Sequence, residues 1–416
     1  MNLRCMWVLT LVGTCSVAPC GFAAEPLRLE EAVARALLAN PTIQAEVARL
    51  EAVRNRANRE ALPATYVVGA DFENVAGTGG LSGVDSAETT LRIGRVLELG
   101  GKRDARAALG DAEINLQRGA EGVAKLDITN STTQRFIQAA VAQEHVENAE
   151  ERVRHANSTR REVARWVQAA RNPDSDLRAA EITLADAELK HELALQALQG
   201  AKARLAASWG ALTPDFDTVI ADLDTLPPLA DFGILAGRLP QTPQQRLAQL
   251  ETESIAARRR IAVASGKPDV NVSLGVRRLE ATGDQGLVMS FSLPLGSQRR
   301  ASYSVAEADA DLAAVHARAQ VTGLEQRQQL FDRYQLMQQA RSEVEALRAR
   351  MLPKAQEAIS LTRRGFEAGR FSFLALAQAE KTLFDLRERE VEAAARYYTL
   401  LVEVERLTAQ FPDASQ

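Results

Sequence analysis

The sequence predicts a mainly α-helical protein with a small β part, and three observations lead to this fold class. Ala, Leu, Glu, Gln and Arg dominate the 416 residues, while aromatic residues make up only 5%, a composition that favours long helices. The stretch 102–171 contains no proline, and as one helix its 70 residues would form a rod of about 105 Å. Four short stretches instead alternate apolar and polar residues with period two, as strands do.

The first 23 residues have the pattern of a secretory signal peptide. Arg4 supplies the positive start, 6–12 an apolar run and 21–23 an A-x-A-like cleavage site. The three cysteines all lie in this segment: Cys5, Cys15 and Cys20. A mature chain without them would have no disulfide, thiolate nucleophile or thiolate metal site. Lipid attachment at Cys20 stays open as an alternative, although Pro19 stands where a lipobox has a small, flexible residue.

The overall composition excludes two classes of protein. An apolar content of 46% rules out wholesale disorder. The 50 basic and 54 acidic residues give a net charge of −4, and no segment is basic enough to follow a phosphate backbone, so nucleic acid is not an expected partner. After residue 23 no run of 18 apolar residues occurs, so no helix is expected to span a bilayer.

The alternating stretches predict two β-hairpins, over 64–97 and 268–295, each with a Gly-rich or polar turn. Within each strand the apolar positions fall on one face. In the second hairpin they are Val270, Val272, Leu274, Val276, Leu287, Met289, Phe291 and Leu293.

The order helix, hairpin, long helix and returning helix occurs twice, which indicates an internal two-fold repeat. Prolines punctuate the chain, and none lies between Pro63 and Pro173 or between Pro294 and Pro353. Near the end, Ala393, Tyr397, Leu400, Val404 and Leu407 form a seam typical of coiled-coil packing. We divide the chain into a signal peptide (1–23), a first repeat (24–208, with the long helix pair 102–208), an irregular equatorial connection (209–240), a second repeat (241–410, with the long helix pair 299–410) and a tail (411–416).

A strand with one apolar and one polar or small face suits a sheet between lipid and water. Four strands cannot close a barrel, because single-chain outer-membrane barrels start at about eight strands. Three copies would supply about twelve strands and a tube of long antiparallel helices, a helical barrel that continues the shared trimeric β-barrel. The alternative is a soluble hairpin on a coiled coil, packed on one side. The strands alone do not decide between them, and the export signal favours the membrane.

Three motifs carry a resemblance to a known family over the whole mature chain. They are Leu29-Glu30-Glu31-Ala32-Val33 leading to Asn40-Pro41, Leu99-Gly100-Gly101-Lys102-Arg103 after the second strand, and Arg364-Gly365-Phe366-Glu367-Ala368-Gly369 at the second helical turn. In this order, duplicated around two hairpins, they make the chain resemble the TolC-like outer-membrane efflux proteins, and within them the CzcC-type heavy-metal efflux branch.

The resemblance implies an outer-membrane homotrimer with its helical barrel in the periplasm. Such a conduit would meet outer-membrane lipid, join a periplasmic membrane-fusion (adaptor) protein and serve, indirectly, an inner-membrane pump of the resistance-nodulation-division class. The cargo would be heavy-metal cations such as cobalt, zinc or cadmium. Organic drugs and type I protein secretion remain alternatives within this class, and a soluble periplasmic coiled-coil structural or adaptor protein is the alternative from another class.

The resemblance also places functional residues at the ends of the long helices. The periplasmic tip and adaptor contact would comprise Arg171, Asn172, Pro173, Arg364, Gly365, Phe366 and Gly369. Arg370 would pair with Asp174 or Asp176 across neighbouring turns to hold the tip closed. Related channels often have aspartates shortly after this turn, whereas residues 374–378 read Leu-Ala-Leu-Ala-Gln, so no acidic gate is expected there.

The sequence contains no complete motif for catalysis or for a dedicated metal site. His191-Glu192 begins like the zinc-protease motif H-E-x-x-H, but Leu195 stands at the second histidine position. Gly101-Lys102 is no phosphate loop, because the required preceding glycine is Val96. The chain is therefore not expected to be an enzyme or to hold a cofactor, and a pump upstream would set the specificity for the cargo.

Overall fold

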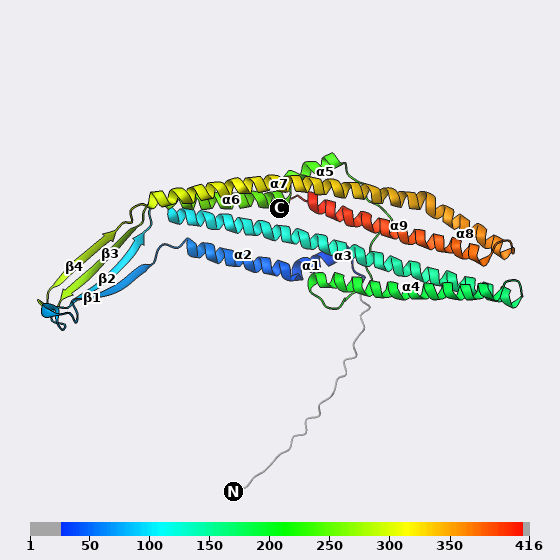
Figure 1. Ribbon diagram of the computed structural model, residues 1–416, viewed down its shortest axis with the longest axis horizontal. Helices are drawn as coiled ribbons and strands as arrows, with labels where there is room; N and C mark the ends of the chain where they lie inside the picture. Colours follow the sequence, from blue (N-terminus) through cyan, green and yellow to red (C-terminus); the bar gives the residue numbers. More distant parts are fainter. Residues whose placement is uncertain (1–25, 411–416) are drawn as a thin grey trace, which may run out of the picture.

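The structure is a computed structural model that describes residues 26–410. The predicted signal peptide, Cys20 and the tail 411–416 lie outside the described residues. The described chain forms an elongated rod of long helices, with one small sheet at one end and two helical turns at the other (Figure 1). The predicted fold class, mainly helical with a small β part, is confirmed.

The first half of the chain runs along the rod twice. α1 (Leu29–Ala39) and α2 (Pro41–Glu60) lead to the sheet. After the first hairpin, α3 (Lys102–Gln168) returns along the whole rod, and α4 (Asp174–Ala206) then runs part of the way back. Both α2 and α4 pack on α3, so the shorter helices lie one after the other along the long one (Figure 1).

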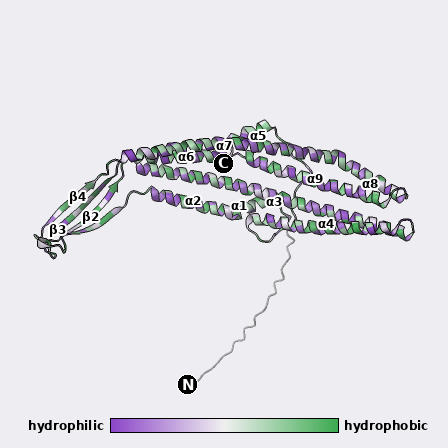
Figure 2. Cartoon of the chain, in the orientation of Figure 1, coloured by the Kyte–Doolittle hydropathy of each residue, from purple (hydrophilic) through white to green (hydrophobic). Residues whose placement is uncertain are grey.

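The second half repeats this order. α6 (Pro243–Ala264) leads to the sheet, α7 (Ser297–Ala346) and α8 (Leu352–Glu367) return to the far end, and α9 (Phe373–Thr408) runs back. α6 and α9 pack on α7, and α3 joins the two halves through its contacts with α6 and α9. Polar and apolar residues alternate around these helices (Figure 2). Among residues 26–410, no helix is both long enough and apolar enough to cross a membrane.

The sheet contains four antiparallel strands in the order of the sequence. They are β1 (Tyr66–Glu73), β2 (Glu88–Leu97), β3 (Val270–Leu279) and β4 (Gln285–Ser292). Each hairpin pairs within itself, and the β2–β3 ladder joins the two hairpins into one sheet. β1 and β4 are the edges, and no other strand of residues 26–410 pairs with their outer sides.

Two left-handed glycines turn the strands into the long helices. Gly101 (φ +72°) directly precedes α3, and Gly296 (φ +90°) directly precedes α7. Gly100 is left-handed as well, and a Cβ on it would lie 3.0 Å from the Ala264 carbonyl oxygen at the end of α6. Glycine is required here both for its backbone conformation and for close packing, which explains the Leu-Gly-Gly motif.

The helices pack through small residues and through one apolar seam along α9. A Cβ on Gly110 would lie 2.7 Å from the Ala57 Cβ, so α2 and α3 approach closely at this point. Along α9, Tyr397 and Val404 are almost fully buried. Ala393 and Leu407 are buried too, and Leu400 packs against the same cluster, which confirms the predicted seam.

Pro353 does not end its helix. The chain passes from α7 into α8 through one π-helical turn, Leu347–Met351. Proline lacks an N–H group and crowds the carbonyl four residues earlier, and the wider turn makes room for its ring without breaking the rod. The second long helical passage therefore continues past Pro353 to the turn at 364–369, where the sequence motif placed the second helical turn.

The connection between the halves is tied to the middle of the rod. It contains one short helix, α5 (Phe232–Arg238), and a bridge in which Leu27 N–H donates to the Thr218 carbonyl over 2.9 Å. The Tyr398 hydroxyl on α9 donates to the Asp222 carbonyl over 2.9 Å. These bonds fix an otherwise irregular segment across both halves of the chain.

Candidate functional site

The two faces of the sheet differ sharply in chemistry. The register places Val68, Ile93, Leu274 and Met289 in one row across the four strands. Their neighbours in the strands extend this apolar face, which includes Leu91, Val276, Leu287 and Phe291. Phe291 is 80% exposed and Val68 77% exposed, and no helix covers them. An exposed apolar surface of this kind needs a lipid or protein partner.

The opposite face carries charged and small residues. Arg277 on β3 binds Glu73 on β1 (2.9 Å) and Glu88 on β2 (2.7 Å). Glu73 and Glu88 are direct cross-strand neighbours, so one guanidinium offsets the repulsion between two facing carboxylates. Arg92 likewise binds Asp71 over 3.1 Å. The sheet is therefore polar on one side and apolar on the other, as a wall between water and lipid requires.

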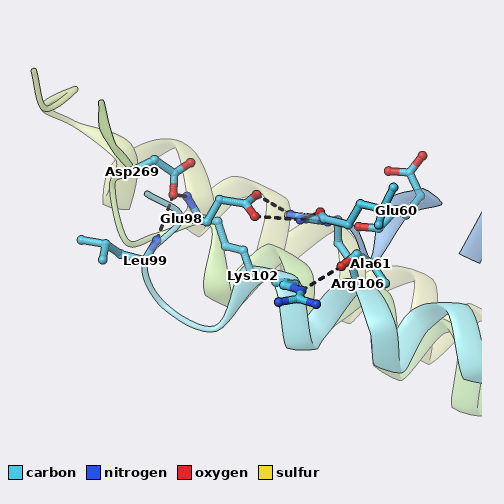
Figure 3. A network of polar contacts seen from close by, with 9 residues as sticks. Glu60, Ala61, Glu98, Leu99, Lys102, Arg106 and Asp269 are labelled. Carbon is cyan, nitrogen blue, oxygen red and sulfur yellow. Dashed lines mark hydrogen bonds and ion pairs between the residues drawn. The ribbon is translucent and has the colours of Figure 1, made fainter. Parts of the chain in front are cut away.

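A polar cluster fastens the sheet to the helices (Figure 3). The Arg106 guanidinium on α3 donates two hydrogen bonds to the Glu98 carboxylate, of 2.6 and 2.8 Å, and another to the Glu60 carbonyl at the end of α2. Lys102 Nζ donates to Asp269 over 2.6 Å, just before β3. The motif that follows β2 thus ties both repeats to the base of the sheet.

The cluster makes the stability of this junction depend on pH. The hydrogen bonds from Arg106 lower the pKa of Glu98 below its ordinary value. A carboxylate with a lowered folded-state pKa stabilises the fold fully above its unfolded pKa of about 4.3 and loses that effect as the pH falls through the folded value. We therefore expect Glu98→Gln to cost about 1.5 kcal/mol near neutral pH and to flatten the acid limb of the thermal midpoint plotted against pH.

Glu60→Gln is the matched control for this prediction. It removes the same charge nearby, but the Glu60 carboxylate pairs only with its exposed neighbour Arg59, and such pairs contribute little. Equal acid limbs in the two variants would contradict the role given to Glu98.

At the far end of the rod, both helical turns have the same backbone geometry. After α8, Arg370 N–H donates to the Gly365 carbonyl and Gly369 N–H to the Phe366 carbonyl, each over 2.8 Å. After α3, Arg171 N–H donates to Trp166 and Ala170 N–H to Val167 in the same pattern. Both are Schellman motifs, in which one left-handed residue ends the helix.

The left-handed position holds Gly369 (φ +68°) in one turn but Ala170 (φ +53°) in the other. Left-handed backbone costs a residue with a Cβ about 1–2 kcal/mol, and part of this is offset because glycine is freer in the unfolded chain. Ala170→Gly is therefore expected to stabilise the first turn by about 0.5–1 kcal/mol, measured as slower hydrogen exchange in peptides covering 163–180. Ala169→Gly, at a neighbour with φ −83°, should give no gain, and a similar gain there would contradict the strain argument.

The two turns are held together by an aromatic stack. The rings of Trp166 on α3 and Phe366 on α8 lie with centroids 4.5 Å apart and planes at 18°. Phe366 is fully buried in a cluster with Val163, Phe373 and Leu376. A residue without exposed side chain cannot contact an adaptor, so we remove Phe366 from the predicted contact surface and assign it to the core of the tip.

Four of the other predicted tip residues, together with Arg370, line one open hollow of about 570 Å³. Arg171, Asn172 and Pro173 line it from the first turn, and Gly369 and Arg370 from the second. Arg364 is exposed, whereas a Cβ on Gly365 would lie 2.1 Å from the Phe371 ring, so this glycine is needed to seat the ring.

The predicted gate residues stand at the two turns of the tip and do not pair with each other among the described residues. Asp176 accepts a hydrogen bond from Asn172 Nδ2 over 2.8 Å, and Asp174 and Asp176 stand in the first turn of α4, where acidic groups favour the helix dipole. Within residues 26–410 no ion pair joins Arg370 to either aspartate, so the gate pairing needs a second chain.

Sequence reasoning missed a buried polar cluster above the tip. Glu380 on α9 is 6% exposed, and it accepts hydrogen bonds from Thr159 on α3 (3.0 Å) and from Arg363 on α8 (2.7 Å). It joins three helices of both halves. The only signal in the sequence is a charged residue one helical turn after the apolar Leu376 and two turns after Phe373, and this pattern is too common to identify it.

Within the described residues, no cluster of three or more histidine, cysteine or acidic side chains is arranged to hold a metal ion. The histidines at 155 and 191 approach single glutamates, Glu151 and Glu150, at 3.6 Å.

Comparison with known proteins agrees with this geometry. Residues 239–410 match the family of outer membrane efflux proteins. The cobalt-zinc-cadmium resistance protein CzcC of Cupriavidus metallidurans is 28% identical over 321 residues, covering 77% of this chain and 76% of that protein.

Solved structures share the fold over nearly the whole chain. CusC, described in connection with transmembrane channel formation, superposes with a TM-score of 0.77 at 14% identity, covering 92% of each chain. The outer membrane protein VceC of Vibrio cholerae gives 0.75 at 17% identity, covering 92% of this chain and 96% of that one. Residues 239–410 therefore match the outer membrane efflux protein family, and nearly the whole chain has the fold seen in CusC and VceC.

Proposed function

We propose that this protein is the subunit of a passive channel in the outer membrane, with its sheet in the lipid and its helices in the periplasm. The observation that carries the proposal is the two-faced sheet. Its apolar face is exposed, the other face carries the paired charges around Arg277 and Arg92, and among the described residues no helix covers either side. Burial of the apolar face in lipid stabilises this arrangement, whereas water would leave it unfavourably exposed.

The channel is a homotrimer in this proposal. The outer sides of β1 and β4 are open edges, and open edges are not tolerated in the hydrocarbon region. Three copies, each contributing four strands, would close a barrel of about twelve strands and remove all edges. The long helices would continue that barrel as a tube.

The cargo and the partners follow from the relatives. CzcC is named for cobalt, zinc and cadmium resistance, and on this basis we assign heavy-metal cations as the cargo of this chain too. A periplasmic adaptor would dock at the helical tip and connect it to an inner-membrane resistance-nodulation-division pump. The protein itself would conduct passively, so the pump would select the ion.

The proposal includes a gate at the tip, in which Arg370 of one copy pairs with Asp174 or Asp176 of the next. All three are at least partly exposed, and their turns border one hollow. Arg370→Ala should therefore raise the conductance of channels reconstituted in planar bilayers, because opposite charges no longer hold neighbouring turns together. A variant that conducts no more than the parent removes the gate, and Arg178→Ala, a charge paired locally with Glu181, is the control.

Fractionation of native membranes, followed by mass measurement of the detergent-solubilised particle, tests the channel itself. An outer-membrane trimer is the expected result. Recovery in the soluble fraction as a monomer or dimer would favour the coiled-coil structural or adaptor alternative. Deletion of the gene should sensitise cells to cobalt, zinc or cadmium, while sensitivity only to organic compounds, or loss of a secreted polypeptide, would reassign the cargo.

A further inference from the structure

We propose that β4 of one copy pairs with β1 of the next copy in one defined register, with Phe291 opposite Tyr66. The inference rests on the proposed trimeric channel and goes beyond it, because it identifies which residues meet. It follows from the internal repeat. The chain contains one junction between its two repeats, β2 with β3, and the junction between chains joins the same two kinds of edge.

The first step is to align the second strands of the hairpins. β2 is followed by Leu97-Glu98-Leu99-Gly100, and β4 runs into Leu293-Pro294-Leu295-Gly296. The two glycines have nearly the same left-handed φ, +84° and +90°. This equivalence places Phe291 of β4 where Arg95 stands in β2, both on the apolar face.

The second step uses the register inside each hairpin. Tyr66 is the Cα partner of Arg95, and Val272 is the Cα partner of Phe291. Since Arg95 and Phe291 are equivalent, Tyr66 and Val272 are equivalent as well.

The third step transfers the junction seen within the chain to the junction between chains. In the β2–β3 ladder Arg95 is opposite Val272. Replacing each residue by its equivalent sets Phe291 opposite Tyr66 of the next copy. One residue further along each strand, Ser290 then meets Val67 on the polar face.

This register keeps the chemistry of the two faces continuous. Beyond the Phe291–Tyr66 pair, Met289 would meet Val68 and Leu287 would meet Ala70, so three successive pairs on the lipid-facing side are apolar. The next pair, Gln285 with Phe72, lies at the ends of the two strands, beside the hairpin turns. A slip of one residue would turn one strand over and mix the faces. A slip of two residues would preserve the faces, but the ladder between chains would then differ in length from the β2–β3 ladder. The helices of neighbouring copies would also be shifted along the barrel axis relative to one another.

Oxidative cross-linking in native membranes tests the register. The only cysteines in the sequence are Cys5, Cys15 and Cys20, all in the predicted signal peptide. The cross-linked product of each introduced cysteine pair can therefore be compared with that of variants carrying only one of the two new cysteines. Val67→Cys combined with Ser290→Cys should give covalent dimers and trimers that a reductant reverses, because a disulfide requires Cβ atoms about 3.5–4.5 Å apart. Ser290→Cys combined with Thr65→Cys or Gly69→Cys shifts the pair by two residues either way and should give less than about a tenth of that product.

Ser273→Cys with Ser290→Cys is the positive control, since these hydroxyls lie 2.7 Å apart within one chain. If that control oxidises internally and a shifted pair cross-links best, or no pair does while the detergent particle is still a trimer, the register is wrong. If the particle is a monomer, the proposed trimeric channel fails, and the register with it.

Discussion

Replacing Phe366 by alanine is expected to cost about 3–5 kcal/mol and to separate the two helical turns at the tip. Phe366 is fully buried, and it stacks on Trp166 from the other half of the chain. Truncation would leave a cavity between α3 and α8 that Val163 and Leu376 cannot fill without moving the helices. The loss should remain local, because a rod of helices is held together by neighbouring contacts rather than by one central core.

Hydrogen exchange by mass spectrometry measures this directly. Exchange should accelerate in peptides covering 160–180 and 360–380, while peptides covering the seam around Tyr397 stay protected. Phe371→Ala is the matched control, since it removes the same ring from the same turn at a position that is 51% exposed. If both variants exchange alike, the Trp166–Phe366 stack does not hold the tip.

The sequence predicted those parts of the fold whose cause is local. Period-two alternation located the strands, and the absence of proline located the long helices. The Leu-Gly pattern after each hairpin marked the strand-to-helix turns, where Gly100 and Gly296 adopt left-handed backbone. Gly369 could be predicted for the same reason, because it ends α8 in a Schellman motif.

The features that were not predicted depend on which helices meet. Phe366 belongs to a motif at a turn and was therefore expected on the surface, but the partner that buries it, Trp166, lies 200 residues earlier in the chain. Glu380 similarly meets Thr159 of α3 and Arg363 of α8. No local pattern encodes such contacts, since they exist only once the two halves of the rod lie side by side.

The π-helical turn before Pro353 also depends on packing and was not predicted. Proline usually breaks or kinks a helix, and nothing in the local sequence shows how the chain accommodates this one. Here α7 and α8 each pack on α9, so the helix axis is kept by contacts on both sides of the proline and only one turn widens. The distinction between a break and a bulge thus lies in tertiary packing.

Replacing Met289 by lysine is expected to cost about 2–4 kcal/mol, if the apolar face lies in lipid as proposed. Met289 is in the middle of β4, opposite Leu274, and is 70% exposed in the single chain. In water such an exposed substitution would change stability by less than about 0.5 kcal/mol. The same variant therefore gives a large loss of stability for a membrane-embedded sheet and a small one for a soluble hairpin.

Ser290→Lys supplies the control, because Ser290 is the next residue of the same strand and lies on the opposite face, beside the Ser273 hydroxyl. Urea titration of protein refolded into lipid vesicles should show a large loss for Met289→Lys and little change for Ser290→Lys. Two small losses would mean that neither face meets hydrocarbon. Exposed apolar residues on the sheet would then have to be covered by protein, and the open edges of β1 and β4 would no longer require a closed barrel. The asymmetry between two adjacent residues thus decides whether this chain forms a channel wall.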